Sequence, residues 1–333
     1  MVASPLVLAA DFGGTKTAVC LAAVAQDMPR EIIHEARFDS VAWSSATALI
    51  NAFLNGLPRP QAACLALAAP VEGRRVRLTN LPLWVDADEI EAVCGIAHVH
   101  LINDFVATGY GIEALAPSDL LTLQAGEPVL HAPRAVLGAG TGLGEALLVW
   151  QGDHYAVLPS EGGHVDFAPT DEEQIGLWRF LSQRHGHVSY ERILSGPGLT
   201  ALMEYICGDQ GMACDLARAI REEGAAAVTH AALERGDALA DRALELFCRI
   251  YGAQAGNLAL TAWAKGGVYL AGGIAARLPA RLAASGFLEA FRAKGRFRQA
   301  MERFPVHLVL RPDTALKGAL RLAARSLSRP SST

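Results

Sequence analysis

The sequence lacks several features that would place it in particular classes of protein. Lys and Arg number 29 against 34 for Asp and Glu, so the net charge is −5. Proteins that bind nucleic acids or anionic membranes usually carry a concentrated basic face, so neither partner is expected. Its apolar runs are far shorter than the roughly 20 residues that span a bilayer. The run Leu6–Ala10 ends at Asp11 and is too short for a signal-peptide core.

Cysteine is scarce and scattered along the chain. None of the six cysteines forms a C-x-x-C pair or a Cys/His cluster. A disulfide framework and a structural zinc site are therefore not favoured. Several cysteines lie inside apolar runs, where the side chain acts as a small hydrophobe. We expect buried thiols in a reducing, cytoplasmic setting at Cys20, Cys64, Cys94, Cys207, Cys214 and Cys248.

Two familiar nucleotide-binding patterns are also missing. The sequence contains no G-x-x-x-x-G-K-[ST] loop, so a Walker A site is not expected. The glycine-rich stretch 138–144 does not match G-x-G-x-x-G and no long helix follows it. A Rossmann dinucleotide site is therefore disfavoured.

The pattern of apolar residues predicts an α/β protein with two domains. The chain has 333 residues, of which 51% are hydrophobic, enough for two buried cores. Strands come first and then alternate with helices, which is typical of a mixed sheet in an α/β layer. Pro117 marks the expected crossing between domains, with residues 1–116 and 313–330 in a small domain and 117–312 in a large one. Strands are expected over 5–10, 17–24, 31–37, 62–68, 98–102, 134–137, 267–271 and 306–310, and helices over 45–55, 86–93, 106–115, 237–263 and 314–327.

The first candidate site follows the first strand, at Asp11-Phe12-Gly13-Gly14-Thr15. Paired glycines allow positive φ and let backbone N–H groups approach a ligand. Such groups form a concave anion site, and a neighbouring Asp can hold a metal ion through water. The stretch thus suggests a phosphate clamp with a Mg²⁺ ligand. An ordinary hairpin turn explains the same residues.

A second candidate lies at Asn103-Asp104, where a strand passes into a helix. Ligands of open α/β sheets sit outside the carboxyl ends of the strands, so this polar pair is well placed for chemistry. Asp is also a favoured helix N-cap, which is a purely structural explanation for Asp104. The two roles can coexist.

The stretch Gly138-Ala-Gly-Thr-Gly-Leu-Gly144 repeats the opening arrangement of strand, Gly/Thr turn and strand. Two such turns facing each other across a cleft could supply backbone N–H groups to one polyphosphate. Two unrelated hairpins remain the alternative. A further pair of glycines, Gly272-Gly273, stands between a strand and a helix, where a ring or a phosphate can approach the helix N-terminus.

The loop 158–167 brings Glu161 and His164 close together between glycines. A carboxylate accepts hydroxyl hydrogens and a neutral imidazole both accepts and donates, which suits the binding of a polyol. Exposed Glu and His residues in a glycine-rich loop can equally be inert.

Taken together, these motifs resemble the bacterial glucokinase family. They stand in that family's order over nearly the whole chain, and the ordered set is far more specific than any single motif. The stretches that carry the resemblance are 11–15, 103–105, 138–144, 161–169, 191–198, 271–274, 285–287 and 294–297. It implies an α/β, two-domain actin-like (ribonuclease-H-like) sugar kinase fold with an interdomain cleft that closes on ATP and a sugar.

The resemblance also implies a role for each candidate residue. Asp104 would be the general base for the sugar hydroxyl, and Asp11 would bind Mg²⁺ through a water molecule. Glucose would be held by Asn103, Asp104, Glu161, His164 and Glu191. ATP would be held by Ala10, Asp11, Phe12, Gly13, Gly14, Thr15, Gly138, Gly140, Thr141, Gly142, Gly272 and Gly273. A homodimer would be the expected assembly.

Three alternatives stay open at this point. The chain could phosphorylate another hexose, because each polar sugar contact also suits a close epimer. It could be a sugar sensor without catalysis, or an actin-like scaffold.

Lys16 departs from the Asn that many zinc-free glucokinases carry after the threonine, which affects the detail of the phosphate turn. The Cys-rich zinc motif of the related repressor–ORF–kinase family is absent.

Overall fold

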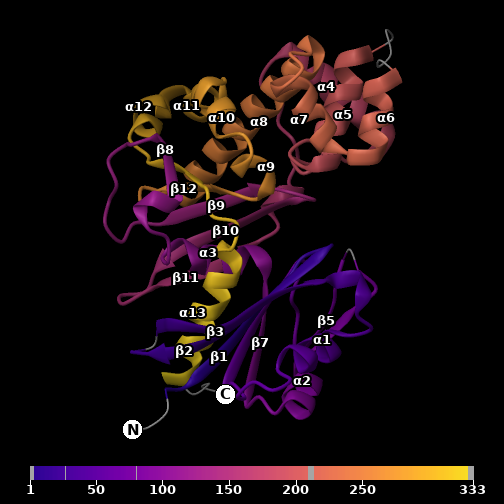
Figure 1. The fold of residues 1–333 in the computed structure, drawn as a ribbon. Coiled ribbons are helices and arrows are strands. Elements are labelled where there is room, and N and C mark those ends of the chain that lie inside the picture. The colour runs from indigo at the N-terminus through magenta and orange to yellow at the C-terminus, as the bar shows by residue number, and fades with distance from the viewer. Residues whose placement is uncertain (1–3, 27, 80, 209–213, 329–333) are drawn as a thin grey trace. The chain divides into compact units, whose positions relative to one another are not determined.

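The computed structural model describes residues 4–26, 28–79, 81–208 and 214–328 (Figure 1). The chain divides into two units. The first consists of Met1–Pro117, Tyr155–Pro159 and Asp313–Thr333, and the second of Ser118–His154 and Ser160–Pro312.

The first unit is built on a five-stranded sheet with the order β3-β2-β1-β4-β7. Strands β1, β2 and β3 pair antiparallel, whereas β1, β4 and β7 run parallel. Strands β5 and β6 form a separate antiparallel ribbon. The strand bounds are β1 (Leu6–Phe12), β2 (Lys16–Ala25), β3 (Met28–Asp39), β4 (Ala62–Leu67), β5 (Arg75–Arg77), β6 (Trp84–Asp86) and β7 (His98–Asn103). The helices are η1 (Ser40–Ala42), α1 (Ala46–Phe53), α2 (Ala87–Cys94), α3 (Asp104–Ile112) and α13 (Thr314–Ser328).

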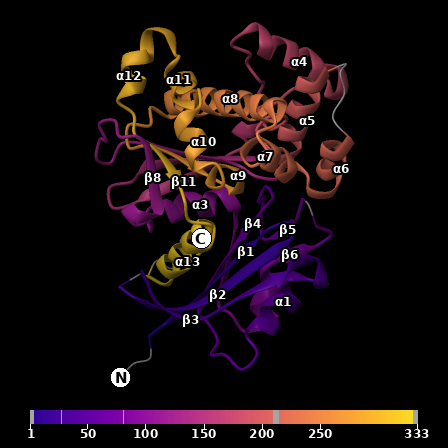
Figure 2. The same cartoon turned by 45° about the horizontal axis from the view of Figure 1, so that its top comes forward.

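Alternation along β1 divides the first unit's core between the two faces of this sheet. Leu8, Ala10 and Phe12 belong to one buried cluster with residues of α1 and α2. Val7 and Ala9 belong to another buried cluster with residues of α3 and α13. Successive side chains of a strand point to opposite faces, so a strand covered on both faces is apolar throughout. Figures 1 and 2 show α13 and α1 on opposite sides of the sheet.

The other sheet is six-stranded, with the order β11-β10-β9-β12-β13-β8, and all its strands except β11 lie in the second unit. Strand β9 pairs antiparallel with β10 and parallel with β12. The strand bounds are β8 (Leu120–Gln124), β9 (Arg134–Ala139), β10 (Leu143–Trp150), β11 (Tyr155–Ser160), β12 (Val268–Ala271) and β13 (Val306–Val309). The helical segments are η2 (Pro117–Asp119), η3 (Gly162–His164), α4 (Glu172–His185), α5 (Gly196–Cys207), α6 (Cys214–Glu223), α7 (Ala225–Leu233), α8 (Ala238–Ala262), α9 (Gly273–Ala276), α10 (Pro279–Ala284), α11 (Phe287–Arg292), η5 (Gly295–Phe297) and α12 (Arg298–Glu302).

Helix α8 is the longest helix in the described residues, with 25 residues, and packs against α5, α7 and α11 (Figure 2). It begins at the cap Asp237, whose carboxylate accepts from the N–H groups of Leu239 and Ala240 at 2.9 Å each. It ends at Trp263, which takes a left-handed conformation with φ of 49°. The apolar spacing in 237–263 predicts this helix and its role in the core, and both are confirmed.

Sequence patterns predict the main elements well and the short ones poorly. The mixed α/β architecture is confirmed, and Ser45, Asp86 and Ser195 cap helices in the structure. The ribbon of β5 and β6 is not predicted, because three residues are too few to show alternation. Strands β8 and β11 and the helices α4, α10, α11 and α12 are also not predicted. The expected frayed tail at 329–333 lies outside the described residues.

The described residues allow two sequence expectations to be checked, namely buried thiols and apolar segments too short to span a membrane. Cys20, Cys64, Cys94, Cys207 and Cys248 are buried and free, as predicted. The side chain at position 214 lies outside the described set. Within the described ranges, every helix is too short or too polar to cross a bilayer.

Helices α3 and α13 approach closely because each carries a glycine at their contact. A Cβ at Gly318 would overlap the carbonyl oxygen of Ala107, and one at Gly111 would overlap the carbonyl oxygen of Thr314. Gly318→Ala should therefore lower Tm, because forcing the helices apart costs roughly 1–3 kcal/mol and exceeds the gain in helix propensity of about 1 kcal/mol.

Gly196→Ala in α5 is the matched control, since its nearest atoms would lie 3.6 and 3.8 Å from the added Cβ. Thermal unfolding followed by circular dichroism measures both variants. Equal Tm values for Gly318→Ala and wild type would contradict the close contact.

Candidate functional site

The turn between β1 and β2 is held in shape from η1. Gly13 N donates to the carbonyl oxygen of Lys16 at 3.2 Å, and Ser40 N donates to that of Thr15 at 2.9 Å. Ser40 Oγ also donates to the carbonyl oxygen of Gly13 at 3.1 Å. Gly13 and Gly14 do not take positive φ, so the expectation of left-handed glycines here is wrong. The absence of a side chain serves close approach instead, since a Cβ on Gly13 would lie 3.0 Å from the Lys16 oxygen.

Asp11 lies just before this turn and is partly exposed. Desolvation raises the pKa of its carboxyl from 3.8 to about 6. Among the described residues, its carboxylate takes part in no hydrogen bond or ion pair. Nor do the described residues contain a cluster of three or more His, Cys, Asp or Glu side chains that could hold a metal ion. A poorly solvated carboxylate of this kind is stabilised by a nearby cation.

The step from β7 to α3 places Asn103 and Asp104 at the same edge of the sheet. Asn103 is the N-cap of α3, and its Oδ1 accepts from Phe105 N at 2.8 Å and Val106 N at 3.3 Å. Its Nδ2 donates to the carbonyl oxygen of Ala69 at 3.3 Å. The purely structural cap role considered for Asp104 thus belongs to Asn103. Asp104 is the first helical residue instead, with Oδ1 accepting from Phe105 N at 2.9 Å.

The sheet register brings the Asp11 turn and Asn103 together within the first unit. Asp11 pairs with Ala66 of β4, and Ala66 pairs with Ile102 of β7. Neighbouring strands lie about 4.8 Å apart, so Asp11 and Ile102 are separated by about 10 Å across the sheet. The polar residues that end these parallel strands therefore lie along one edge.

In the second unit, the glycine-rich turn between β9 and β10 is joined directly to Glu191. Leu143 N donates to Glu191 Oε2 at 2.9 Å. A Cβ at Gly142 would overlap that same oxygen, so glycine leaves room for the carboxylate in this position. Gly196 N, at the start of α5, donates to the carbonyl oxygen of Gly140 at 2.8 Å. The predicted phosphate turn and a predicted sugar ligand thus form one local structure.

Glu161, His164 and Glu191 come together in the second unit. His164 Nε2 lies 3.8 Å from Glu161 Oε2, and His164 Nδ1 lies 3.7 Å from Glu191 Oε1. Glu191 N donates to the carbonyl oxygen of Gly163 at 2.9 Å, which ties the two segments together. The side chains of Glu161 and His164 are 63% and 58% exposed, so their polar atoms remain accessible. These three residues present two acceptor carboxylates around one imidazole, and they are called the sugar trio below because the sequence analysis expects them to hold glucose.

The pair Gly272-Gly273 lies beside the same glycine-rich turn. Gly272 has φ of 86° and caps the short helix α9. A Cβ there would lie 2.6 Å from the carbonyl oxygen of Ala139. Ala271 of β12 pairs with Gly138 of β9 in parallel, so both strands deliver their glycines to one edge of the second sheet.

Sequence reasoning missed Glu145, a buried carboxylate two residues beyond the glycine-rich turn. It is 1% exposed, and desolvation raises the pKa of its carboxyl from 4.5 to about 7. Gln254 Nε2 donates to Glu145 Oε1 at 2.8 Å. The available signal was a single charge inside the apolar strand 143–150.

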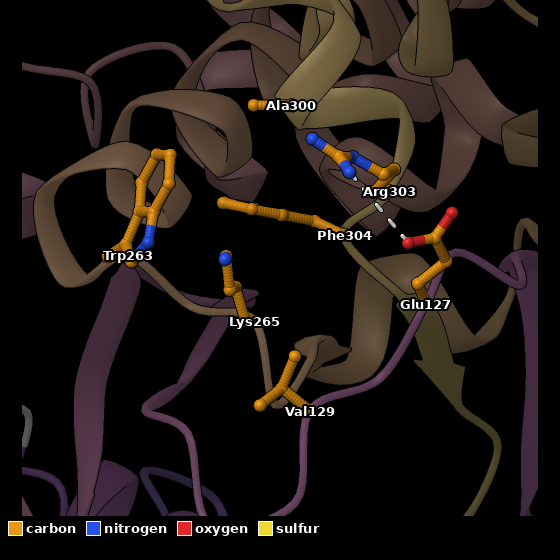
Figure 3. Close-up of a pocket in the computed structure, with 7 residues that line it drawn as sticks. All are labelled: Glu127, Val129, Trp263, Lys265, Ala300, Arg303 and Phe304. Atoms are coloured by element: carbon orange, nitrogen blue, oxygen red, sulfur yellow. Dashed lines mark ion pairs between the residues drawn. The ribbon is translucent and has the colours of Figure 1, made fainter.

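A separate surface hollow lies elsewhere in the second unit (Figure 3). Trp263, Lys265 and Phe304 surround it, and Arg303 lies 4.0 Å from Glu127 at its rim. None of the residues predicted from the sequence to bind sugar or nucleotide lines it. The hollow is therefore unrelated to the predicted site.

Comparisons with known proteins agree on one family. The model of the glucokinase family matches residues 8–326. A glucokinase of Nostoc punctiforme is 40% identical over 339 residues, covering 96% of this chain and 99% of the relative. The crystal structure of a glucokinase from an Antarctic psychrotroph has a TM-score of 0.83 and 32% identity, covering 96% of this chain and 98% of the other.

A more distant solved structure shares the fold alone. It is a ROK family glucokinase from Streptomyces griseus in complex with glucose and AMPPNP. Its TM-score is 0.64 and its identity 19%, over 96% of this chain and 99% of the other.

The raised pKa of Glu145 predicts a pH-dependent stability. The unfolded carboxyl titrates near 4.5 and the folded one near 7, so the folded state binds the proton more tightly. Stability is therefore lost as the pH rises from about 4.5 to 7, by up to about 3 kcal/mol. Glu145→Gln removes this loss and should raise Tm relative to wild type at pH 7.5, but much less at pH 5.

The matched control is Glu31→Gln on the exposed edge of β3, which removes one negative charge from the chain without touching the core. Differential scanning calorimetry at the two pH values gives the comparison. A Glu145→Gln variant whose Tm difference from wild type is the same at pH 5 and 7.5 would refute the titration.

Proposed function

The chain belongs to the glucokinase family, and from this membership we propose that it transfers the γ-phosphoryl group of ATP to glucose, forming glucose 6-phosphate, with Asp104 as general base. The match to the family model over residues 8–326 carries this proposal. The chain is an α/β enzyme with the actin-like fold of these sugar kinases. The sugar trio in the second unit supports glucose as the acceptor.

Asp104 is proposed to take the proton of the sugar hydroxyl. As the bond between the sugar oxygen and the γ-phosphorus forms, the bond from that phosphorus to the β-γ bridging oxygen breaks and ADP leaves. The hydroxyl proton passes to the Asp104 carboxylate, a role that typically contributes 10²–10⁴-fold. Its place at the start of α3, beside the cap Asn103, supports this role because the strand end and helix start fix the side chain.

Glucose is proposed to be held by Asn103, Asp104 and the sugar trio. The carboxylates of Glu161 and Glu191 accept hydroxyl hydrogens, and His164 both accepts and donates. Asn103 Nδ2 donates one of its two hydrogens to the carbonyl oxygen of Ala69, and its other hydrogen would be donated to the ligand. This assignment needs both units, because the base belongs to the first and the trio to the second.

ATP is proposed to bind at the glycine turns of both units. Backbone N–H groups of the two turns would contact the phosphates, since phosphoryl transfer depends mainly on positioning and charge neutralisation. Gly272 and Gly273 would lie near the adenosine. The AMPPNP in the Streptomyces griseus structure supports an adenine nucleotide as donor. The residues assigned to the first turn are Ala10, Asp11, Phe12, Gly13, Gly14 and Thr15, and those assigned to the second are Gly138, Gly140, Thr141 and Gly142.

Mg²⁺ is proposed as the cofactor, with Asp11 as its protein ligand through water. The carboxylate fits this role because desolvation raises its pKa and none of the described residues pairs with it. Mg²⁺ usually keeps several waters and binds through one or two carboxylates together with substrate phosphates. When bound, the ion neutralises charge on the phosphates. We further propose a homodimer working in the cytoplasm, as the family resemblance implies.

An assay of ADP release with a panel of sugars tests the proposed activity. With ATP and Mg²⁺, glucose should give the highest kcat/KM among glucose, mannose, fructose and glucosamine. ADP and polyphosphate replace ATP in parallel reactions. No sugar-dependent ADP release would refute the kinase activity, and a clear preference for another hexose would reassign the substrate.

The role of Asp104 predicts a specific loss in the variant Asp104→Asn. Its kcat should fall by about 10²–10⁴-fold, whereas glucose should bind within a few-fold of wild type because the amide keeps the shape and one acceptor. Coupled kinetics and isothermal calorimetry measure the two quantities.

Asp237→Asn at the cap of α8 is the matched control, since Asn caps a helix as well as Asp. It should keep wild-type kcat. If Asp104→Asn keeps near-normal turnover, Asp104 is not the base.

A further inference from the structure

A chain of polar side chains runs through the second unit from Lys294 to Glu145. Lys294 Nζ donates to Asn257 Oδ1 at 2.7 Å and to the carbonyl oxygen of Ala253 at 2.8 Å. Asn257 Nδ2 donates to Gln254 Oε1 at 3.3 Å, and Gln254 Nε2 donates to Glu145 Oε1 at 2.8 Å. This hydrogen-bonded chain of side chains thus links the segment after α11, the middle of α8 and strand β10.

The charged groups at the two ends of this hydrogen-bonded chain, on Lys294 and Glu145, fix the orientation of both amides between them. An ammonium only donates and a carboxylate only accepts. Asn257 must therefore turn its oxygen toward Lys294, and Gln254 must turn its nitrogen toward Glu145. The remaining nitrogen of Asn257 and oxygen of Gln254 then complete the link between them. The arrangement is an ion pair bridged by two aligned amides, which are polarised in the same direction.

This chain is expensive to bury. Desolvation raises the pKa of Glu145 to about 7 and lowers the pKa of Lys294 to about 8. Apolar side chains of similar volume are often at least as stabilising as a buried ion pair. The retention of charge at this place therefore suggests a task other than stability.

This hydrogen-bonded chain contacts both backbone segments that carry the sugar trio. Asn257 Nδ2 also donates to the hydroxyl of Tyr190, at 2.9 Å, and Tyr190 directly precedes Glu191. The second carboxylate oxygen of Glu145 lies against Gly162, where a Cβ would overlap it. Gly162 directly follows Glu161 in η3. One contact thus bears on Glu191, and the other on Glu161 and His164.

Helix α8 is shaped to admit the far end of the chain. A Cβ at Gly256 would lie 2.6 Å from Lys294 Cε and 2.5 Å from the carbonyl oxygen of Phe291. Gly256 therefore leaves the space through which the Lys294 side chain reaches Asn257.

We propose that Gln254 and Asn257 are positioning residues for the sugar: they hold Tyr190 and Glu145, and through them set the spacing of Glu161, His164 and Glu191. The inference rests on the proposed function, and it adds residues on α8 to the determinants of sugar affinity. Catalytic groups must be held to within a fraction of an ångström by the residues that support them. Losing Gln254 removes the donor that holds Glu145 and one partner of Asn257, whereas losing the Tyr190 hydroxyl releases the segment that carries Glu191. The hydrogen bonds of the glycine turn through Leu143 and Gly196 involve neither group.

The test compares two buried glutamines of the second unit. Gln254 is 4% exposed and Gln124 of β8 is 6% exposed. Gln124 Nε2 donates to the carbonyl oxygens of Met301 and Phe304 at 2.8 and 2.6 Å, so Gln124→Leu also removes buried hydrogen bonds. Gln254→Leu should raise the KM and Kd for glucose by about 10-fold or more, with the KM for ATP within twofold of wild type. Gln124→Leu should lower Tm comparably without changing the KM for glucose.

Tyr190→Phe is the second variant, and it guards against a failure of Gln254→Leu to fold. It removes only the hydroxyl that Asn257 contacts and keeps the ring, which packs edge-on against Phe167 at 5.5 Å between centroids. It should raise the KM and Kd for glucose several-fold while kcat changes less.

Calorimetric Kd values for glucose separate this inference from the proposed function. A wild-type protein that binds glucose but releases no ADP would refute the kinase activity, and the Kd values of the variants would still decide the positioning role. The inference is overturned if glucose Kd stays within twofold of wild type in a folded Gln254→Leu or Tyr190→Phe, or if Gln124→Leu weakens glucose binding equally. A selective loss of glucose affinity in both Gln254→Leu and Tyr190→Phe supports the inference.

Discussion

The hydrogen bond from Leu143 N to Glu191 Oε2 is the contact on which the second unit's site depends. It exists because residue 142 has no side chain, since a Cβ there would overlap the carboxylate oxygen. One donor thus fixes both the turn that follows β9 and an acceptor proposed to hold the sugar. The groups proposed to bind phosphate and the Glu191 carboxylate proposed to bind sugar are therefore joined in one local structure.

In the first unit, the pairing of strands in the sheet brings the candidate site residues together. Parallel pairing of β1, β4 and β7 delivers Asp11 and Asn103 to one edge, because their register aligns the carboxyl ends of the strands. Strands β1 and β4 are buried on both faces, and a slip of one residue would move every apolar side chain to the other face. The core therefore fixes the register, and the register fixes which polar residues are neighbours.

The sequence predicted what local chemistry determines. Ser45, Asp86 and Ser195 are caps because their side chains satisfy N–H groups at the start of a helix, and this needs no knowledge of the fold. At Asn103-Asp104 two good caps stand side by side, and only the backbone shows that Asn103 has the extended conformation of a cap. Glu145 could not be assigned, because its partner Gln254 lies 109 residues away in the sequence. The absence of positive φ at Gly13 and Gly14 likewise follows from tertiary bonds to Ser40.

Asp11 and Glu145 are both desolvated carboxylates, but they differ in their hydrogen-bond partners. Burial raises the pKa of both carboxyls, to about 6 and about 7 respectively. Glu145 has an amide donor on α8, and through it a link to an ammonium, so its charge is compensated within the protein. Asp11 has no such partner among the described residues. A carboxylate compensated from within can support structure, whereas an uncompensated one at a strand end is stabilised by a cation from outside. This difference in partners supports the proposed roles of Glu145 in positioning and of Asp11 in binding Mg²⁺.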